Sequence, residues 1–296
     1  MYHMPVMLEA AIEGLSIKPG GIYIDATFGG GGHAKEILNR LGDGRLVAFD
    51  QDKEAERNVP DDSRITFLNH NFRYMENFLT LYSCLPVDGI LADLGVSSYQ
   101  LDEASRGFST RYSGPLDMRM DKSSGITARE VVNIYEHNKL AEIFNIYGEL
   151  RQAGKIARHI ETYRLQKTIE TTDELVKVLS TLAPRGKENK FFAQVFQALR
   201  IEVNHELESL KELLTQCPGM LKPGGRIVVI SYHSLEDRLV KNFFRAGNFL
   251  GEVGKDFFGN PVTPLKPLGK SQVASNEEII RNPRARSARL RIAEKK

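Results

Sequence analysis

The sequence has 296 residues, of which 41% are hydrophobic and 26% charged, and its formal net charge is +2. This composition is typical of a globular protein, and the length is sufficient for two domains. No apolar run approaches the roughly 18 residues of a membrane helix, and residues 1–15 lack the basic start and unbroken apolar stretch of a secretory signal, so we expect a cytoplasmic protein that contacts no membrane.

The cysteines and the distribution of charge indicate which kinds of site and partner to expect. Cys84 and Cys217 show no CxxC or Cys/His spacing, so we expect two buried thiols, no disulfide framework and no metal site. Residues 1–104, 105–204 and 205–296 carry net charges of −8, +4 and +6. The basic excess in the later two thirds favours a phosphate-rich partner, although a solvated surface gives such an imbalance as well.

The first hundred residues alternate between apolar runs and helical patterns. The runs predict buried strands at residues 22–25, 45–50, 65–69 and 87–94, and a glycine loop at 29–32 followed by a helix at 33–41 comes after the first of them. Strands alternating with helices at this spacing predict a parallel, doubly wound α/β sheet. Such a sheet binds its ligand at the carboxyl ends of the strands.

The alternation stops after residue 104 and returns after residue 220. Helical patterns fill the region between, at 127–147, 150–164, 172–182 and from 190 onward, before LKPGG at 221–225 introduces a further strand at 226–231. We therefore expect residues 1–104 and 205–296 to form one discontinuous domain. Residues 105–204 would be an inserted helical domain that recognises the substrate.

The glycine loop indicates a cofactor site. It fits the dinucleotide pattern GxGxxA only weakly, and Asp25, four residues before the glycines, would repel a pyrophosphate but attract the amino group of S-adenosyl-L-methionine. Asp50, at the end of the second strand, is placed to accept hydrogen bonds from the ribose hydroxyls of either cofactor. A glycine-rich turn with two capping or surface aspartates is the alternative.

Asp93 ends the fourth strand, where Rossmann-like class I methyltransferases present catalytic groups. An exocyclic nucleobase amine is a poor nucleophile because its lone pair is delocalised, so catalysis must hold it in line with the sulfonium methyl and accept a hydrogen bond from it. A carboxylate at Asp93 is suited to this, although the two prolines and the aromatic residue usual in amino-methyltransferases are missing. The alternative is an aspartate that caps the next helix.

Two further regions are candidates for substrate contact. His233 follows the fifth strand and is placed to contact base or phosphate, or to be a buried histidine bonded to its loop. The loop 106–121, with Arg106 and Arg119 as candidate RNA contacts, has the composition of a flexible lid or of a domain linker.

Basic residues form two other candidate RNA-binding groups. Arg151, Lys155 and Arg158 recur at helical spacing and are placed to follow a phosphate backbone, or to form a solvated face. In the segment 281–296, arginines alternate with apolar residues in the manner of a strand whose arginines are exposed. Its candidate RNA contacts are Arg284, Arg286 and Arg289.

Seven ordered blocks together resemble one family, the RsmH (MraW) family. They are HMPV at 3–6, DATFGGGGH at 25–33, DLGVSS at 93–98, RGFS at 106–109, GPLDMRMD at 114–121, SYHSLEDR at 231–238 and NPRARS at 282–287. The resemblance implies a bacterial enzyme that methylates the exocyclic N4 amine of a decoding-site (P-site) cytidine in small-subunit ribosomal RNA, with S-adenosyl-L-methionine as cofactor. Its partner would be that RNA or the assembled small ribosomal subunit, and a homodimer is left open.

The resemblance also implies cofactor contacts beyond those indicated by the residues alone. By matching position these are the loop residues Gly31, Gly32 and His33, then Asp50 at the ribose, Phe72 near the adenine, and Asp93 and Gln100 beside the transferable group. Phe72 lies in a run, 69–73, that departs from the family pattern.

Three other functions are weighed against this one. Methylation of another nucleic-acid amine, in adenine or DNA cytosine, is the alternative within enzymes, because the shape of a pocket sets its base preference. A non-catalytic RNA-binding assembly factor would tolerate loss of Asp93. A nicotinamide dehydrogenase is disfavoured by Asp25. Titration with S-adenosyl-L-methionine and with a nicotinamide cofactor distinguishes a methyltransferase from a dehydrogenase.

Overall fold

The computed structural model describes residues 5–123 and 125–296 and divides into two compact units. The sheet unit consists of Met1–Gly95 and Leu207–Lys296, and the helical unit of Val96–Glu206. His3 and Met4, in the first of the seven sequence blocks, lie outside the described residues.

The division between the units follows the hydrophobic cores. It falls after residues 95 and 206, whereas the expected boundaries fall after residues 104 and 204. Val96 and Leu101 pack against the core of the helical unit. The segment that leaves the fourth strand therefore belongs to that unit from its first residue.

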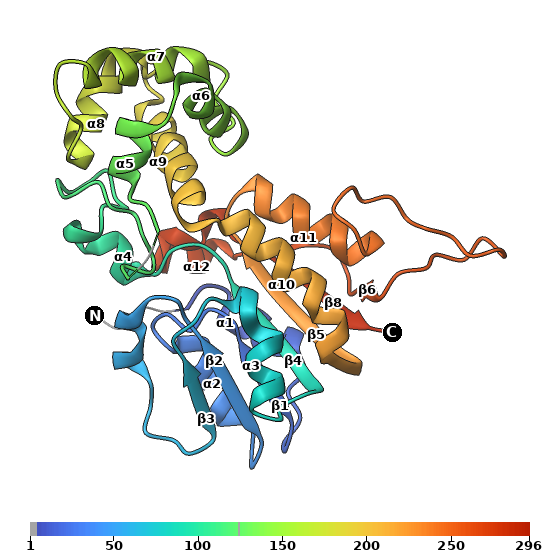
Figure 1. Cartoon of the computed structure of the whole chain (residues 1–296). Coiled ribbons are helices and arrows are strands. Elements are labelled where there is room, and N and C mark those ends of the chain that lie inside the picture. The colour runs from blue at the N-terminus through green and yellow to red at the C-terminus, as the bar shows by residue number, and fades with distance from the viewer. Residues whose placement is uncertain (1–4, 124) are drawn as a thin grey trace. The chain divides into compact units, whose positions relative to one another are not determined.

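The sheet unit is built on one mixed sheet (Figure 1). Its elements are α1 (Leu8–Leu15), β1 (Ile22–Asp25), α2 (Gly32–Arg40), β2 (Arg45–Phe49), η1 (Lys53–Asn58), β3 (Ile65–Leu68), η2 (Phe72–Tyr74), α3 (Met75–Leu81), β4 (Val87–Asp93), α10 (Glu206–Met220), β5 (Leu221–Ser231), α11 (Ser234–Ala246), β6 (Leu265–Pro267), β7 (Gln272–Val273), α12 (Asn276–Arg281), η5 (Pro283–Ser287) and β8 (Arg289–Lys295). The strand order is β3-β2-β1-β4-β5-β8-β6, with β7 also paired to β8.

The five strands predicted from the sequence run parallel to one another, as expected. The segment 289–295 forms the predicted sixth strand, β8, which pairs antiparallel with β5 and carries β6 and β7 antiparallel to itself. The sheet is therefore a parallel Rossmann-like sheet with an antiparallel edge.

Helices cover both faces of this sheet (Figure 1). Helices α1 and α2 bury Ile12 and Ile37 against one face. Helices α3, α10 and α11 cover the other face with residues such as Leu79, Leu213 and Phe244. Three layers of this kind bury the strands on both sides and leave the strand ends as the place for polar side chains.

The helical unit has its own core. Its helices are α4 (Ser98–Asp102), η3 (Ala104–Arg106), α5 (Ala128–Ile134), α6 (His137–Ile146), α7 (Ala153–Arg164), α8 (Thr172–Leu179), η4 (Ser180–Leu182) and α9 (Glu188–Asn204). The single helix expected over 127–147 is two helices, because Tyr135 and Glu136 adopt extended backbone conformations. Residues from α5, α6, α7, α8 and α9 meet in one hydrophobic cluster.

Both cysteines and the hydropathy of the helices bear on the class of protein. Cys84 and Cys217 are buried free thiols, as predicted. Within the described residues, no helix combines the length and hydropathy that a membrane span requires.

Candidate active site

Three aspartates lie at the carboxyl end of the parallel strands. Asp25 ends β1, Asp93 ends β4, and Asp50 directly follows β2. The chain continues from β1 toward β2 and β3 on one side and toward β4 and β5 on the other, so the strand order reverses between β1 and β4. Doubly wound sheets bind their ligands at this reversal.

Asp25 is a buried acid with an unused oxygen. Asp25 is only 1% exposed. Its Oδ1 accepts a hydrogen bond of 3.1 Å from the Thr27 amide. Oδ2 is buried and has no hydrogen-bond donor among the described residues. Burial, helped by the nearby Asp50 charge, raises the pKa of Asp25 to about 7. A cationic donor placed here would satisfy Oδ2 and restore the ionised form.

Asp50 holds the glycine loop. Its Oδ2 accepts a 2.7 Å hydrogen bond from the Gly29 amide, and Oδ1 accepts one of 2.8 Å from the Asp52 amide. Gly31 has φ of +72°, and a Cβ there would lie 2.8 Å from the ring of Phe28. Asp50 thus has a positioning role that the sequence did not predict, in addition to the expected ribose contact.

Phe72 is half-buried in η2, which is fixed to the end of β2. Asn71 donates a 2.7 Å hydrogen bond to the Gln51 side chain, and Asn69 donates one of 2.9 Å to the carbonyl of Asp50. These bonds keep Phe72 beside the segment that carries Asp50.

Asp93 is bonded to a residue that the sequence did not single out. The Tyr232 hydroxyl donates a 2.7 Å hydrogen bond to Asp93 Oδ1. Burial raises the pKa of Asp93 to about 7; the Asp25 and Glu236 charges act in the same direction, and the Tyr232 hydrogen bond opposes them. The pKa of Tyr232 is raised well above its ordinary value, again mainly by burial.

His33 presents a second acceptor beside Asp93. Its Nε2 lies 3.1 Å from the carbonyl oxygen of Val6, and its Nδ1 lies 3.8 Å from Asp93 Oδ2. Burial lowers the pKa of His33 to about 4, so the ring is neutral near pH 7. A carbonyl can only accept, so Nε2 carries the hydrogen and Nδ1 carries a lone pair.

His233 is the N-cap of α11. Its Nδ1 accepts a 3.4 Å hydrogen bond from the Glu236 amide. A carboxylate oxygen of Glu236 in turn accepts hydrogen bonds from the amides of Tyr232 and His233, at 2.8 and 3.3 Å. This reciprocal arrangement is a capping box. The geometry gives His233 a structural role, and its catalytic role stays a prediction.

Two residues of the helical unit are mainly structural. Gln100 is 4% exposed and accepts a 3.0 Å bond from the Ser97 amide in the capping box of α4. Arg106 is 1% exposed and donates to the carbonyls of Arg119 and Met120, at 2.9 and 3.1 Å. Because its guanidinium is buried, we withdraw Arg106 as an RNA contact.

The loop 106–121 is also not the flexible lid that its composition suggested. Leu116, Met118 and Met120 are buried in the core of the helical unit, and the Met120 amide donates a 2.7 Å bond to Asn204. Arg119 is held by Asp117 through two hydrogen bonds of 2.9 Å. This loop is part of the packed structure.

The basic row predicted near α7 is solvent-exposed. Arg151, Lys155 and Arg158 are exposed, and the apolar positions between them, Ala153, Ile156, Ala157 and Ile160, are buried. Within the residues that the structure describes, none of the three forms an ion pair. The row keeps its charge available for an anionic partner.

The C-terminal arginines divide into two kinds. Arg286 and Arg289 are exposed, and Arg284 is half-buried. The expectation that the arginines of this strand are all exposed is wrong for Arg291, which binds Asp237 through bonds of 2.7 and 3.0 Å. Strand β8, which lies between β5 and β6, therefore uses Arg291 to hold α11.

Comparison with known proteins identifies the family. A family model described as the MraW methylase family matches residues 1–296. The chain belongs to the MraW methylase family. Two relatives named ribosomal RNA small subunit methyltransferase H support this: one from Phocaeicola vulgatus is 55% identical and covers 100% of this chain and 98% of the relative. One from Cytophaga hutchinsonii is 54% identical and covers 100% of both.

Solved structures provide one further comparison for this MraW methylase chain. An rRNA methylase from Streptococcus thermophilus aligns over 97% of this chain and 94% of that one, with a TM-score of 0.44 and 10% sequence identity.

Proposed function

We propose that this protein transfers the methyl group of S-adenosyl-L-methionine to the exocyclic N4 amine of a decoding-site cytidine in small-subunit ribosomal RNA. The observation that carries the proposal is the pair of acceptors, Asp93 Oδ2 and His33 Nδ1, 3.8 Å apart at the point where the strand order reverses. The names of the family relatives support the RNA substrate.

The acidic strand ends fit a cationic cofactor. The unpartnered Oδ2 of Asp25 suits an ammonium group, and the ribose hydroxyls would donate hydrogen bonds to Asp50 at the end of β2. Phe72 would contact the adenine. Gly31 and Gly32 allow close approach of the loop backbone. When bound, S-adenosyl-L-methionine supplies an electrophilic methyl group on a sulfonium.

Asp93 and His33 then orient the nucleophile. The two hydrogens of an exocyclic amine would donate to Asp93 Oδ2 and His33 Nδ1, which leaves the nitrogen lone pair directed at the methyl carbon. As the nitrogen–carbon bond forms and the carbon–sulfur bond breaks, positive charge develops on the nitrogen. The ionised Asp93 stabilises that charge and takes the departing proton.

RNA affinity is assigned to exposed basic residues on both units. In the helical unit these are Arg151, Lys155 and Arg158, and in the sheet unit Arg286 and Arg289. Gln100 is retained as a cofactor contact on the basis of the resemblance alone. Action on ribosomal RNA would place the protein in the cytoplasm.

The direct test is transfer of labelled methyl from S-adenosyl-L-methionine to free RNA, to unmethylated small subunits and to DNA, followed by mapping of the modified base. We expect label on a cytidine N4 of the small-subunit RNA. Label on adenine or on DNA would replace this substrate with another amine, and no label on any acceptor would support a non-catalytic role.

The Asp93→Asn variant tests the mechanism. It keeps the shape and an acceptor oxygen but removes the negative charge, so kcat should fall by about a hundredfold while the Kd for RNA changes little. Single-turnover transfer at saturating S-adenosyl-L-methionine measures this step. A near-normal rate would show that the Asp93 charge is not needed for transfer.

A further inference from the structure

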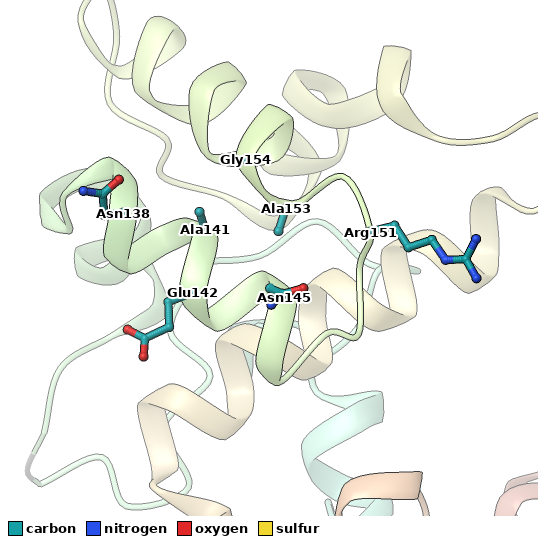
Figure 2. A pocket seen from close by; sticks show the side chains of 7 residues that line it. All are labelled: Asn138, Ala141, Glu142, Asn145, Arg151, Ala153 and Gly154. Atoms are coloured by element: carbon teal, nitrogen blue, oxygen red, sulfur yellow. The ribbon is translucent and has the colours of Figure 1, made fainter.

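A pocket of about 360 Å³ lies in the helical unit between α6 and the start of α7 (Figure 2). Asn138, Glu142 and Asn145 line it from α6, Arg151 lines it from the segment before α7, and Gly154 lines it from α7 itself. The pocket is wide open to solvent, so a group bound there stays partly exposed.

The polar lining is the solvent-facing side of α6. Asn138, Glu142 and Asn145 are four and three residues apart, which places them on one face of the helix. All three are exposed, whereas Leu140, Ile143 and Phe144 on the opposite face are buried in the core. The amide groups are therefore not used for packing.

Gly154 keeps one wall of the pocket open. It lies inside α7, and a Cβ built on it would meet nothing within 4 Å. Glycine destabilises a helix interior relative to alanine. Neither packing nor backbone geometry requires glycine at this position.

The basic row begins at the pocket. Arg151 lines the pocket and is followed along the exposed face of α7 by Lys155 and Arg158, which form no ion pair with any residue in the described part of the chain. Some other cations of the same unit are paired with acids, as in the pairs Arg129–Glu170 and Lys177–Asp173. Charge is thus left unbalanced next to the pocket.

We propose that this pocket holds one unpaired nucleotide of the RNA, with its base in the pocket and the adjoining phosphates on Arg151, Lys155 and Arg158. The proposal rests on the proposed function for its RNA partner. Asparagine amides offer both a donor and an acceptor, as the edges of unpaired bases require. Glu142 disfavours a free phosphate inside the pocket.

Two substitutions at one position test the proposal. Both Gly154→Leu and Gly154→Ala remove the helix glycine, so both should keep or raise the Tm of the full chain, but only leucine fills the pocket. With a fluorescent 12-nucleotide single-stranded RNA of mixed sequence as probe, Gly154→Leu should raise the Kd by about fivefold or more. Gly154→Ala should leave it within about twofold of the wild-type value.

An abasic oligomer of the same length provides the chemical control. Because it offers phosphates but no base, both variants should bind it as the wild type does. Equal Kd values of the two variants for the base-bearing RNA would overturn the proposal. So would a loss of affinity by Gly154→Leu for intact small subunits alone, since that result would mean that the pocket takes a segment of protein.

The methyl-transfer assay keeps this proposal separate from the proposed function. If the wild-type chain transfers no methyl to RNA or small subunits, the proposed function fails. The role of the pocket is still decided by the difference in Kd between the two Gly154 variants.

Discussion

At the Asp25 carboxyl, the proposed cofactor binding and the stability of the fold make opposite demands. Its pKa is raised from 3.8 to about 7 in the folded protein, so between these values the folded state binds more protons than the unfolded state. This contribution to stability is full below about pH 4 and is lost as the pH rises through about 7. An ionised Asp25 in the free protein is therefore unfavourable.

We predict that Asp25→Asn raises the Tm of the free protein at pH 8 and changes it much less at pH 5, where Asp25 is already protonated. The same variant should bind S-adenosyl-L-methionine more weakly at pH 8, because it lacks a charge for the ammonium group. Thermal scans and calorimetry measure the two effects. Asp61→Asn, at an exposed position, is the control, and equal shifts in Tm at both pH values would contradict the prediction.

Tyr232 controls the ionisation of Asp93. Its hydroxyl hydrogen bond lowers the pKa of Asp93 against the effect of burial, so Tyr232→Phe should raise that pKa further. The acid limb of the kcat–pH profile would then move to higher pH, with the rate recovering toward the wild-type value near pH 9. Tyr82→Phe, at an exposed residue, should leave the profile in place. An unchanged profile in Tyr232→Phe would refute this role.

At the scale of elements, the conformation of the glycine loop before α2 requires a glycine at position 31 but not at position 30. Gly31 has φ of +72° and lies against Phe28, whereas a Cβ at Gly30 would meet nothing within 4 Å. Gly31→Ala should cost about 1–2 kcal/mol of folding free energy for the left-handed conformation alone. Gly30→Ala should cost little. Urea unfolding compares them, and equal midpoints would show that the loop adapts.

Strand β8 carries one structural arginine, Arg291, and one arginine that we propose binds RNA, Arg289. Arg291→Ala should destabilise the protein by about 1.5–3 kcal/mol, since it breaks a charged, double hydrogen bond and leaves Asp237 unpaired. Arg289→Ala should leave stability unchanged and reduce the salt dependence of RNA binding, by about 0.7 in log–log slope for a single-strand contact. Denaturant unfolding measures the change in stability, and salt titrations measure the change in RNA binding. Loss of stability in Arg289→Ala together with a reduced salt dependence in Arg291→Ala would contradict the prediction.

The same strand indicates what the sequence can predict about an element. The alternation of Leu290 and Ile292 with arginines predicted a strand here, because that pattern is local. The pairing of Arg291 with Asp237 depends on a contact between residues 54 positions apart, and no local pattern carries it. Arg106 is a similar case: nothing in its neighbourhood indicates that its guanidinium is buried.

For the candidate site, the aspartates at the strand ends could be predicted from the sequence, but their hydrogen-bond partners could not. Asp25, Asp50 and Asp93 were found because they follow apolar runs in a parallel sheet. Tyr232 was missed although it lies beside His233, because its hydroxyl reaches Asp93 across a sequence separation of 139 residues. The hydrogen bond from the Gly29 amide to the Asp50 carboxylate was missed for the same reason.

At the scale of the whole molecule, the sequence predicted an α/β sheet with a helical insertion, because the alternation of apolar runs with helical patterns gives way to helical patterns alone. It did not predict where the insertion begins. Val96 and Leu101 follow a strand without a marked turn, and only their packing against α-helices far along the chain assigns them to the helical unit.

The pairing of β4 with β5, in which Ile90 lies opposite Ile227, also has a consequence for protein synthesis. The ribosome makes all of residues 96–206, a contiguous unit with its own core, before it makes β5. A nascent chain can therefore fold residues 96–206 before strands β5 and β8 of the sheet have been synthesised. During that interval the edge of β4 is open to pairing with other chains, which is the situation that chaperones guard against.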